Sequence, residues 1–403
     1  MLQLSRIEKM ESCCSPDAFA PRWLIMMGIV WVTLGAVGGR AAAAADRPPC
    51  RFPAIYNFGD SNSDTGGISA AFMPIPWPYG ATFFRKAAGR DCDGRLLIDF
   101  IAEELNLPFL SAYLNSLGAN FSHGANFATG GSTIRRQNET IFEYGISPFS
   151  LDVQIWHYDQ FKSRSSDLYN QVTDPYHKSI LPKPEDFSKA LYTFDIGQND
   201  LSAAFRKLSV EQQIAALPNI ISQFSIAVQH LYEQGARSFW IHNTGPIGCL
   251  PVAVMYITDP KPGFLDQYGC IKGQNDMAIE LNRQLKDAVI KLRTQLPEAV
   301  ITYVDLYAAK YGLISTTKNQ GFVDPLKICC GYHEKDGNVW CGQKGLTYNG
   351  TAVFGSSCAK PEEYVSWDGV HYSEAGNKWF ADHILNGLLS DPSIPITHAC
   401  YRN

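Results

Sequence analysis

Charged residues are scarce in this sequence, and those present do not gather by sign. They make up 18% of the 403 residues, and the formal net charge is -5. No cluster of Lys and Arg would attract a phosphate backbone, so we expect no nucleic-acid partner. The apolar fraction of 45% is that of an ordinary globular protein.

Long apolar runs are also lacking, with one exception near the N-terminus. Residues 23–37 form an uncharged run of about 15 residues, shorter than the roughly 20 that a membrane span needs. The run follows a stretch with basic residues and precedes alanines at 41–45. This arrangement predicts a secretory signal peptide over residues 1–45. The alternative is a type II membrane anchor through residues 23–39, because the basic stretch is unusually long.

The cysteines lack the spacing of a metal site. Eleven are present, and Cys13 and Cys14 would leave with the N-terminal segment. Cys329, Cys330 and Cys341 do not form a pair of C-x2-C knuckles, so we expect disulfides and no metal. The nine remaining cysteines are an odd number, which requires at least one free thiol or an intermolecular bond. Their pairing cannot be deduced from spacing.

No internal repeat or low-complexity linker divides residues 46–403, for which we predict a single domain. Short apolar runs alternate with helical patterns, as in a parallel sheet with helices on both faces. Helices are expected around residues 220–231, with Gly235 as a C-cap, and 277–296. Strands are predicted over residues 54–58, 190–194, 238–242 and 300–304. The segments 259–270 and 321–361 are expected to be loops.

The first predicted strand runs directly into a turn that displays Ser61. A serine hydroxyl becomes a nucleophile when a base takes its proton and a third group orients that base. Asp368 and His371 have the spacing to meet across one turn and supply both functions. The same spacing occurs at Asp174 and His177, so spacing alone does not select the pair.

Acyl transfer also needs hydrogen-bond donors for the developing negative charge. The glycine-rich segment that ends in Gly130, Gly131 and Ser132 offers backbone N–H groups. Asn199, directly after the second predicted strand, offers a side-chain amide. Each segment taken alone is equally typical of a turn or a helix cap.

Taken together, the ordered segments Gly-Asp-Ser, Asn…Gly-Gly, Gly-x-Asn-Asp and Asp-x-x-His resemble the GDSL branch of the SGNH hydrolases. The resemblance is closest to the plant GDSL esterase/lipase group, with its nodulin-like and acetylesterase-like members. It covers the chain from about residue 52 to residue 388 and includes Tyr372-Ser-Glu-Ala, which directly follows His371. This position distinguishes His371 from His177.

The resemblance implies an α/β fold, a three-layer α/β/α sandwich with a flavodoxin-like five-stranded parallel sheet. It also implies the residue roles. Ser61 would be the nucleophile, His371 the base and Asp368 its orienting partner. The oxyanion donors would be Ser61 N–H, Gly131 or Gly130, and Asn199. No metal or organic cofactor is implied, and the departure from the family's Leu at Asn62 is expected to affect substrate preference more than activity.

The resemblance predicts a carboxylic ester hydrolase acting through an acyl-enzyme, with no stable protein partner. We expect acetyl or other short-chain esters of cell-wall polysaccharide or glycosides, because residues 71–79 form an aromatic, proline-rich loop and no amphipathic lid is evident. The alternatives are a lipase for longer acyl chains, a fucosidase-like glycosidase and a non-catalytic carbohydrate-binding protein.

The expected location is extracellular, in the cell wall, or the Golgi if the N-terminal segment is an anchor. Three sequons, which begin at Asn120, Asn138 and Asn349, predict N-glycans in that pathway.

Overall fold

The computed structural model describes residues 48–137, 145–334 and 336–401. The predicted signal peptide, its anchor alternative and the sequon at Asn138 lie outside the described residues. Within the described part of the chain, none of the helices combines the length and apolar character needed to cross a lipid bilayer.

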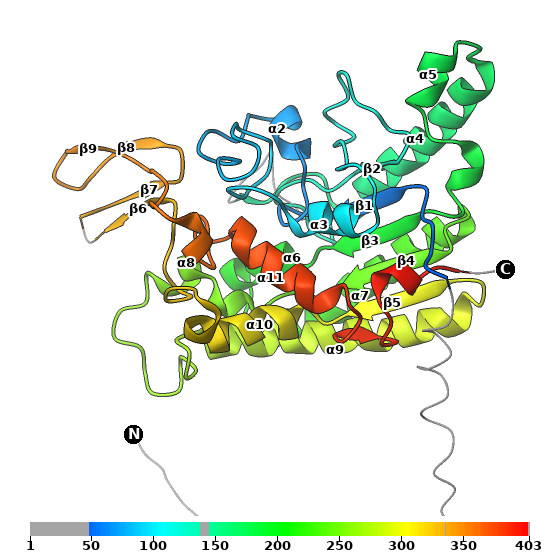
Figure 1. Cartoon of the computed structure of the whole chain (residues 1–403). Helices are drawn as coiled ribbons and strands as arrows, with labels where there is room; N and C mark the ends of the chain where they lie inside the picture. Colours follow the sequence, from blue (N-terminus) through cyan, green and yellow to red (C-terminus); the bar gives the residue numbers. More distant parts are fainter. Residues whose placement is uncertain (1–47, 138–144, 335, 402–403) are drawn as a thin grey trace, which may run out of the picture.

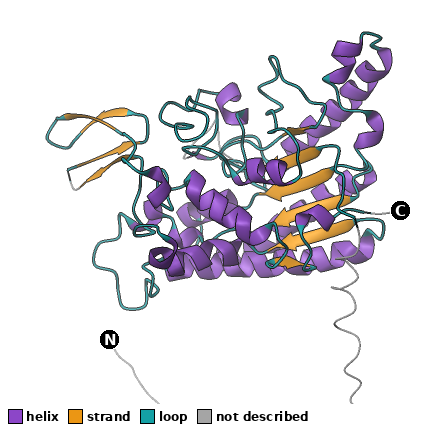
Figure 2. Cartoon of the chain, in the orientation of Figure 1, coloured by secondary structure: helices purple, strands orange, loops and turns teal. Residues whose placement is uncertain are grey.

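The sheet at the centre of the fold is mostly parallel (Figure 2). Its strands are β1 (Ile55–Gly59), β2 (Gly124–Asn126), β3 (Leu191–Asp195), β4 (Ser238–His242), β5 (Val300–Val304) and β10 (Ser390–Asp391). In the described residues their order is β10-β5-β4-β3-β1-β2, and β1 to β5 run parallel. The order 2-1-3-4-5 of the parallel strands is that of flavodoxin-like folds, so the predicted α/β fold class is confirmed.

Helices cover both faces of this sheet, as a parallel sheet requires. Their bounds are α2 (Gly67–Ala71), α3 (Leu97–Glu104), α4 (Leu151–Gln171), α5 (Pro175–Ser179), α6 (Gln198–Lys207), α7 (Val210–Glu233), α8 (Pro251–Val254), α9 (Lys272–Gln295), α10 (Leu306–Thr316) and α11 (Glu374–Ile384). On one face α7 packs between α4 and α9, and on the other α11 packs between α3 and α10 (Figure 1).

The predicted strands are confirmed to within one residue, because each is a short apolar run that the sheet buries completely or nearly so. Every residue of β1, β3 and β4 is buried. Helix α9 buries the stripe of Met277, Leu281, Leu285 and Leu292 that predicted it. Gly235 follows the C-cap of α7 with a φ of 100°, a left-handed conformation that favours glycine.

The edge strand and the cysteine-rich segment differ from the sequence prediction. Strand β10 is antiparallel to β5 and has two residues, too few to leave a pattern. The segment 321–361 was predicted as loops but contains two hairpins, formed by β6 (Gly331–Glu334) with β7 (Gly337–Trp340) and by β8 (Lys344–Leu346) with β9 (Ala352–Phe354). Strands β8 and β9 are largely exposed and β6 is only partly buried, so burial imposed no apolar alternation on their sequences. Strand β7 does bury Gly337 and Val339, but with four residues it is too short to leave a recognisable pattern.

Disulfides account for eight of the described cysteines, as predicted. The pairs are Cys50–Cys400, Cys249–Cys270, Cys329–Cys358 and Cys330–Cys341. Cys92 is a buried free thiol, which is one of the two outcomes that an odd number of cysteines allows. Among the described residues no group of three or more His, Cys, Asp and Glu side chains is arranged to hold a metal ion.

Candidate active site

A cleft of about 370 Å³ lies at the carboxyl edge of the parallel strands, where the chain leaves β1 and enters α6. Its polar lining includes Ser61, Asp91, Gly130, Gly131, Asn199 and His371. Its apolar lining includes Phe72, Met73, Ile75, Trp340 and Val370. The structure therefore brings the predicted serine, histidine and donor segments, far apart in sequence, to one cavity.

The turn that carries Ser61 is held by hydrogen bonds to the neighbouring strand and helix. Asp60 N–H donates to the carbonyl oxygen of Asp195 over 3.1 Å. The side-chain amide of Gln154 donates to the carbonyl oxygen of Gly59 and accepts from its N–H. A Cβ atom at Gly59 would lie 2.6 Å from the Asp195 carbonyl oxygen, so this close approach requires glycine. Ser61 is 8% exposed and lines the cleft.

Asp368 orients the imidazole of His371. One carboxylate oxygen lies 2.7 Å from Nδ1 of His371, and the other accepts the backbone N–H of the same residue. The Tyr79 hydroxyl donates a further hydrogen bond to Asp368 over 2.9 Å. With Nδ1 engaged in this way, Nε2 is buried and has no partner among the described residues. This nitrogen is therefore the one available for proton transfer in the cleft.

The two side chains change each other's pKa. Burial would raise the pKa of Asp368, but the charge and hydrogen bonds of His371 lower it to about 2. Burial would lower the pKa of His371, but the negative charges of Asp368 and Asp91 raise it to about 9. In the described residues no hydrogen bond joins Ser61 to Nε2 of His371. Such catalytic hydrogen bonds are often long in a free enzyme and shorten only when substrate binds.

The structure distinguishes the two glycines of the candidate oxyanion site. Gly130 N–H donates to a carboxylate oxygen of Asp64 over 2.8 Å and is already engaged. Neither Gly131 N–H nor Ser61 N–H has a partner among the described residues, and both residues line the cleft. Gly131 has a φ of 77°, and a Cβ atom there would lie 2.1 Å from the carbonyl oxygen of Gly145. Gly131 therefore fits the donor position better than Gly130.

The side chain of Asn199 lies at the start of α6 and lines the same cleft. Its amide donates to the carbonyl oxygen of Ser132 over 3.0 Å and to Asp60 over 3.3 Å. The hydrogen bond to Asp60 is long, so an oxyanion could replace the Asp60 carboxylate as the acceptor of this N–H.

Comparison with known proteins decides the family. The model of the GDSL-like lipase/acylhydrolase family matches residues 55–384. The chain belongs to this family. A GDSL esterase/lipase of Arabidopsis thaliana is 64% identical over 88% of this chain and 91% of its own length, and one of Zea mays is 51% identical over 87% and 90%. A further Arabidopsis relative, named alpha-L-fucosidase 3, is 50% identical over 84% of this chain and 91% of its own length. Membership of the GDSL family makes the chain a carboxylic ester hydrolase.

The other Asp-x-x-His pair of this GDSL protein is not part of the cleft. Asp174 caps the short helix α5 and contacts His177, and both side chains are exposed. His157 contacts the rings of Tyr113 and Phe149. His383 stacks on a tryptophan ring of α11. Position in the fold therefore separates His371 from His177, His157 and His383.

The acidic residues near the GDSL motifs have structural partners. Asp64 accepts four backbone N–H groups, including that of Gly130. Asp200 accepts two, and Asp60 accepts from Asn62 and Asn199. None of the three acids lines the cleft. The sequence prediction missed two residues of this site, Tyr79, which donates to Asp368, and Asp91, which lines the cleft.

Proposed function

We propose that this GDSL protein is a serine esterase of the secretory pathway that works through an acyl-enzyme on Ser61. The observation that carries the proposal is the placement of His371. Its Nδ1 contacts Asp368, and its unpartnered Nε2 belongs to the cleft that Ser61 lines. A base oriented in this way can take the serine proton.

In the proposed reaction, Nε2 of His371 accepts the proton of Ser61 Oγ while Oγ attacks the acyl carbon. The N–H groups of Ser61 and Gly131 and the amide of Asn199 donate to the oxyanion. As the tetrahedral intermediate collapses, His371 returns the proton to the departing alcohol. Water then attacks the acyl-enzyme with the same base, which releases the acid and restores Ser61.

For the substrate we propose acetyl or other short-chain esters of cell-wall polysaccharide or glycosides. A volume of about 370 Å³ is at the small end of the range of roughly 300–1,000 Å³ for ligand pockets, which favours a short acyl group. Phe72 and Trp340 are partly exposed where they line the cleft and offer flat faces for sugar rings. A lipase for longer acyl chains is the alternative.

A glycosidase has less support, although one relative is named a fucosidase. Its chemistry usually requires two carboxylates on either side of the bond. Among the described residues that line the cleft, Asp91 is the only acidic one. A non-catalytic carbohydrate-binding protein is also disfavoured, because Ser61 and His371 share the cleft.

The secretory location is part of the proposal and rests on two features. Cysteines paired as disulfides are typical of oxidising compartments. Asn120 and Asn349 are exposed, as an N-glycosylation site must be. The proposed destination is extracellular, in the cell wall, with the Golgi as the alternative if the N-terminal segment is an anchor.

The decisive experiment measures ester hydrolysis by variants of the proposed triad. Ser61→Ala and His371→Ala should each lose activity by a factor of up to about 10⁶, and the double variant should lose little more, because the two act as a unit. His177→Ala is the matched control and should retain wild-type activity. If Ser61→Ala kept more than about a tenth of the activity, Ser61 would not be the nucleophile. Assay of a fucoside in parallel tests the glycosidase alternative.

A further inference from the structure

Asp91 is a carboxylate in the cleft that the catalytic proposal does not use. It lines the cavity with His371 and is partly buried. Asp60, Asp64 and Asp368 each accept hydrogen bonds within the protein. The Asp91 carboxylate accepts none from the described residues, although its negative charge acts on His371. Its free acceptor oxygens therefore belong to the substrate-binding surface.

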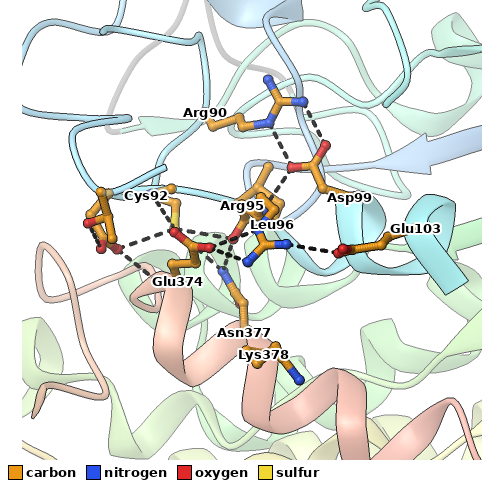
Figure 3. A network of polar contacts seen from close by, with 12 residues as sticks. Arg90, Cys92, Arg95, Leu96, Asp99, Glu103, Glu374, Asn377 and Lys378 are labelled. Atoms are coloured by element: carbon orange, nitrogen blue, oxygen red, sulfur yellow. Dashed lines mark hydrogen bonds and ion pairs between the residues drawn. The ribbon is translucent and has the colours of Figure 1, made fainter. Parts of the chain in front are cut away.

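The residues on both sides of Asp91 are fixed, so its position is built into the fold (Figure 3). Before it, Arg90 forms a two-point ion pair with Asp99 of α3 at 2.7 and 2.6 Å, with side chains 8% and 0% exposed. After it, Asp93 accepts the backbone N–H of Glu374 at the start of α11 over 2.7 Å. Helix α11 begins three residues after His371, so one network holds both walls of the cleft.

Glu374 extends the same network. Its carboxylate pairs with Arg95 over 2.7 Å, and Arg95 also pairs with Glu103 of α3 (Figure 3). Asn377 of α11 donates to the carbonyl oxygen of Arg95. These contacts restrain the segment that carries Asp91 against two helices, which is the support that a specificity-determining side chain requires.

The Asp91 carboxylate is partly buried and lines the cleft, so its remaining hydration comes from water in the cleft. A ligand group that donates a hydrogen bond there replaces that water and gains a hydrogen bond to a charged group. An acetyl or other simple acyl group has no such donor. The donor must then come from the alcohol part of the ester. A neutral hydroxyl suits the position better than a cation, because His371 becomes positively charged beside it during the reaction.

We propose that Asp91 is a specificity-determining residue that accepts a hydrogen bond from a hydroxyl group of the substrate's alcohol. The enzyme would therefore prefer esters of polyhydroxy alcohols, such as sugars, to esters of simple alcohols. This inference rests on the proposed esterase function and gives a physical reason for its substrate class.

The test compares two acetates of similar size, glycerol monoacetate and propyl acetate, which differ in hydroxyl groups. Asp91→Ala should lower kcat/KM for glycerol monoacetate about 10- to 100-fold, the effect of losing a hydrogen bond to a charged group. Propyl acetate should change by less than about threefold, because it has no donor to lose. Asp91→Asn keeps the shape and a weaker acceptor, so its selective loss should be about fivefold.

The comparison uses the pH-independent region of each profile, because Asp91 also affects His371. Burial raises the pKa of Asp91 to about 7, so the carboxylate is ionised where His371 is neutral. Asp174→Ala is the matched control, because it removes an exposed acidic residue at the start of α5. It should leave kcat/KM for both acetates unchanged.

Equal losses on the two acetates in either variant would overturn the inference, because Asp91 would then act through His371 and not on the substrate. A wild-type enzyme that did not prefer glycerol monoacetate would also overturn it. Absence of activity on both acetates, and on other esters, would instead overturn the esterase function itself. If Asp91→Ala failed to fold, Asp91→Asn would still test the inference, because its losses on glycerol monoacetate and on propyl acetate can be compared.

Discussion

At the scale of single residues, the imidazole of His371 is surrounded by negative charge. Asp368 contacts it directly, and Asp91 and Asp60 act on it over longer distances. Tyr79 donates a hydrogen bond to Asp368 and is itself neutral, since burial raises its pKa. The balance holds the proton on His371 more tightly than on a histidine in water, whose pKa is about 6.5.

The pH dependence of the reaction should reflect this charge. In the proposed mechanism only neutral His371 can accept the Ser61 proton, and the pKa of His371 is raised to about 9. Activity should therefore fall as pH decreases, with an apparent pKa in kcat/KM above the ordinary value of about 6.5. Asp91→Asn should lower that apparent pKa, because it removes one of the charges that favour the protonated form. A wild-type midpoint at or below about 6.5, with chemistry rate-limiting, would contradict this.

The amide of Asn199 should contribute to the transition state and not to substrate binding. Asn199→Ala is expected to lower kcat about 10²- to 10³-fold with little change in KM, the effect of losing one oxyanion donor. Asn62→Ala is the matched control, because Asn62 also donates to Asp60 but does not line the cleft. Steady-state kinetics of both variants test the assignment. A rise in KM without a fall in kcat would assign Asn199 to ground-state binding.

The order of four motifs predicted Ser61, Asp368 and His371 as the triad. The structure places Ser61 and His371 in one cleft and Asp368 against His371. The motifs could not distinguish Gly130 from Gly131. The distinction depends on the hydrogen bond that Gly130 N–H donates to Asp64, 66 residues away in the sequence. Asp91 escaped prediction for a similar reason. Its free carboxylate is evident only when the cleft and the partners of the other acids are known.

At the scale of elements, the sequence predicts what is buried and misses what long-range contacts impose. Strands β1, β3, β4 and β5 were predictable because burial on both faces requires apolar runs. Strand β2 has three residues, Gly-Ala-Asn, and forms because it pairs with β1. The hairpins β6–β7 and β8–β9 lie in a segment whose cysteines form two disulfides, a pairing that spacing alone leaves open.

Of two disulfides, Cys50–Cys400 should matter more for stability and Cys330–Cys341 more for activity. Cys50–Cys400 spans 350 residues and lies near the start of β4, where the backbone N–H of Tyr401 donates to Ser238. Cys330–Cys341 spans 11 residues, closes the β6–β7 hairpin, and Cys341 lines the cleft. The backbone N–H of Cys330 also donates to the carbonyl oxygen of Trp367, the neighbour of Asp368.

Replacing both cysteines of each pair by serine separates the two effects. Loss of Cys50–Cys400 should lower the free energy of unfolding by about 5 kcal/mol and loss of Cys330–Cys341 by about 3 kcal/mol, because the longer loop gains more chain entropy. Loss of Cys330–Cys341 should lower kcat/KM about 10- to 100-fold, because the segment that carries Asp368 and His371 would be displaced. Denaturant unfolding and kinetics measure both quantities. A larger loss of activity in the variant without Cys50–Cys400 would contradict the argument.

At the scale of the whole molecule, the cleft depends on segments from most of the chain. Residues after β1 supply Ser61, those after β2 and β3 supply Gly131 and Asn199, and the segment before α11 supplies His371. All of the sheet-derived positions follow carboxyl ends of parallel strands, so the fold class predicted the edge at which they meet. The single domain over residues 46–403 stays a prediction.

The compartment is predicted from features spread along the chain. Asn120 and Asn349 are exposed, and each side-chain oxygen accepts a hydrogen bond from the hydroxyl of its sequon. Eight cysteines form disulfides in the described residues, and Cys92 is a free thiol. Cys13 and Cys14 lie in the predicted N-terminal segment, so the number of thiols reports whether that segment remains.

Thiol titration of the unfolded, unreduced protein therefore distinguishes three cases. A cleaved, secreted chain should show one thiol, Cys92, because eight of its nine cysteines are paired. An anchored chain should show three, since Cys13 and Cys14 would face the reducing cytosol. A cytosolic chain should show all eleven and carry no glycans. The intact mass before and after glycan removal provides an independent check. Eleven thiols on a protein without glycans would overturn the secretory proposal. Three thiols on a glycoprotein would overturn only the prediction that the N-terminal segment is cleaved.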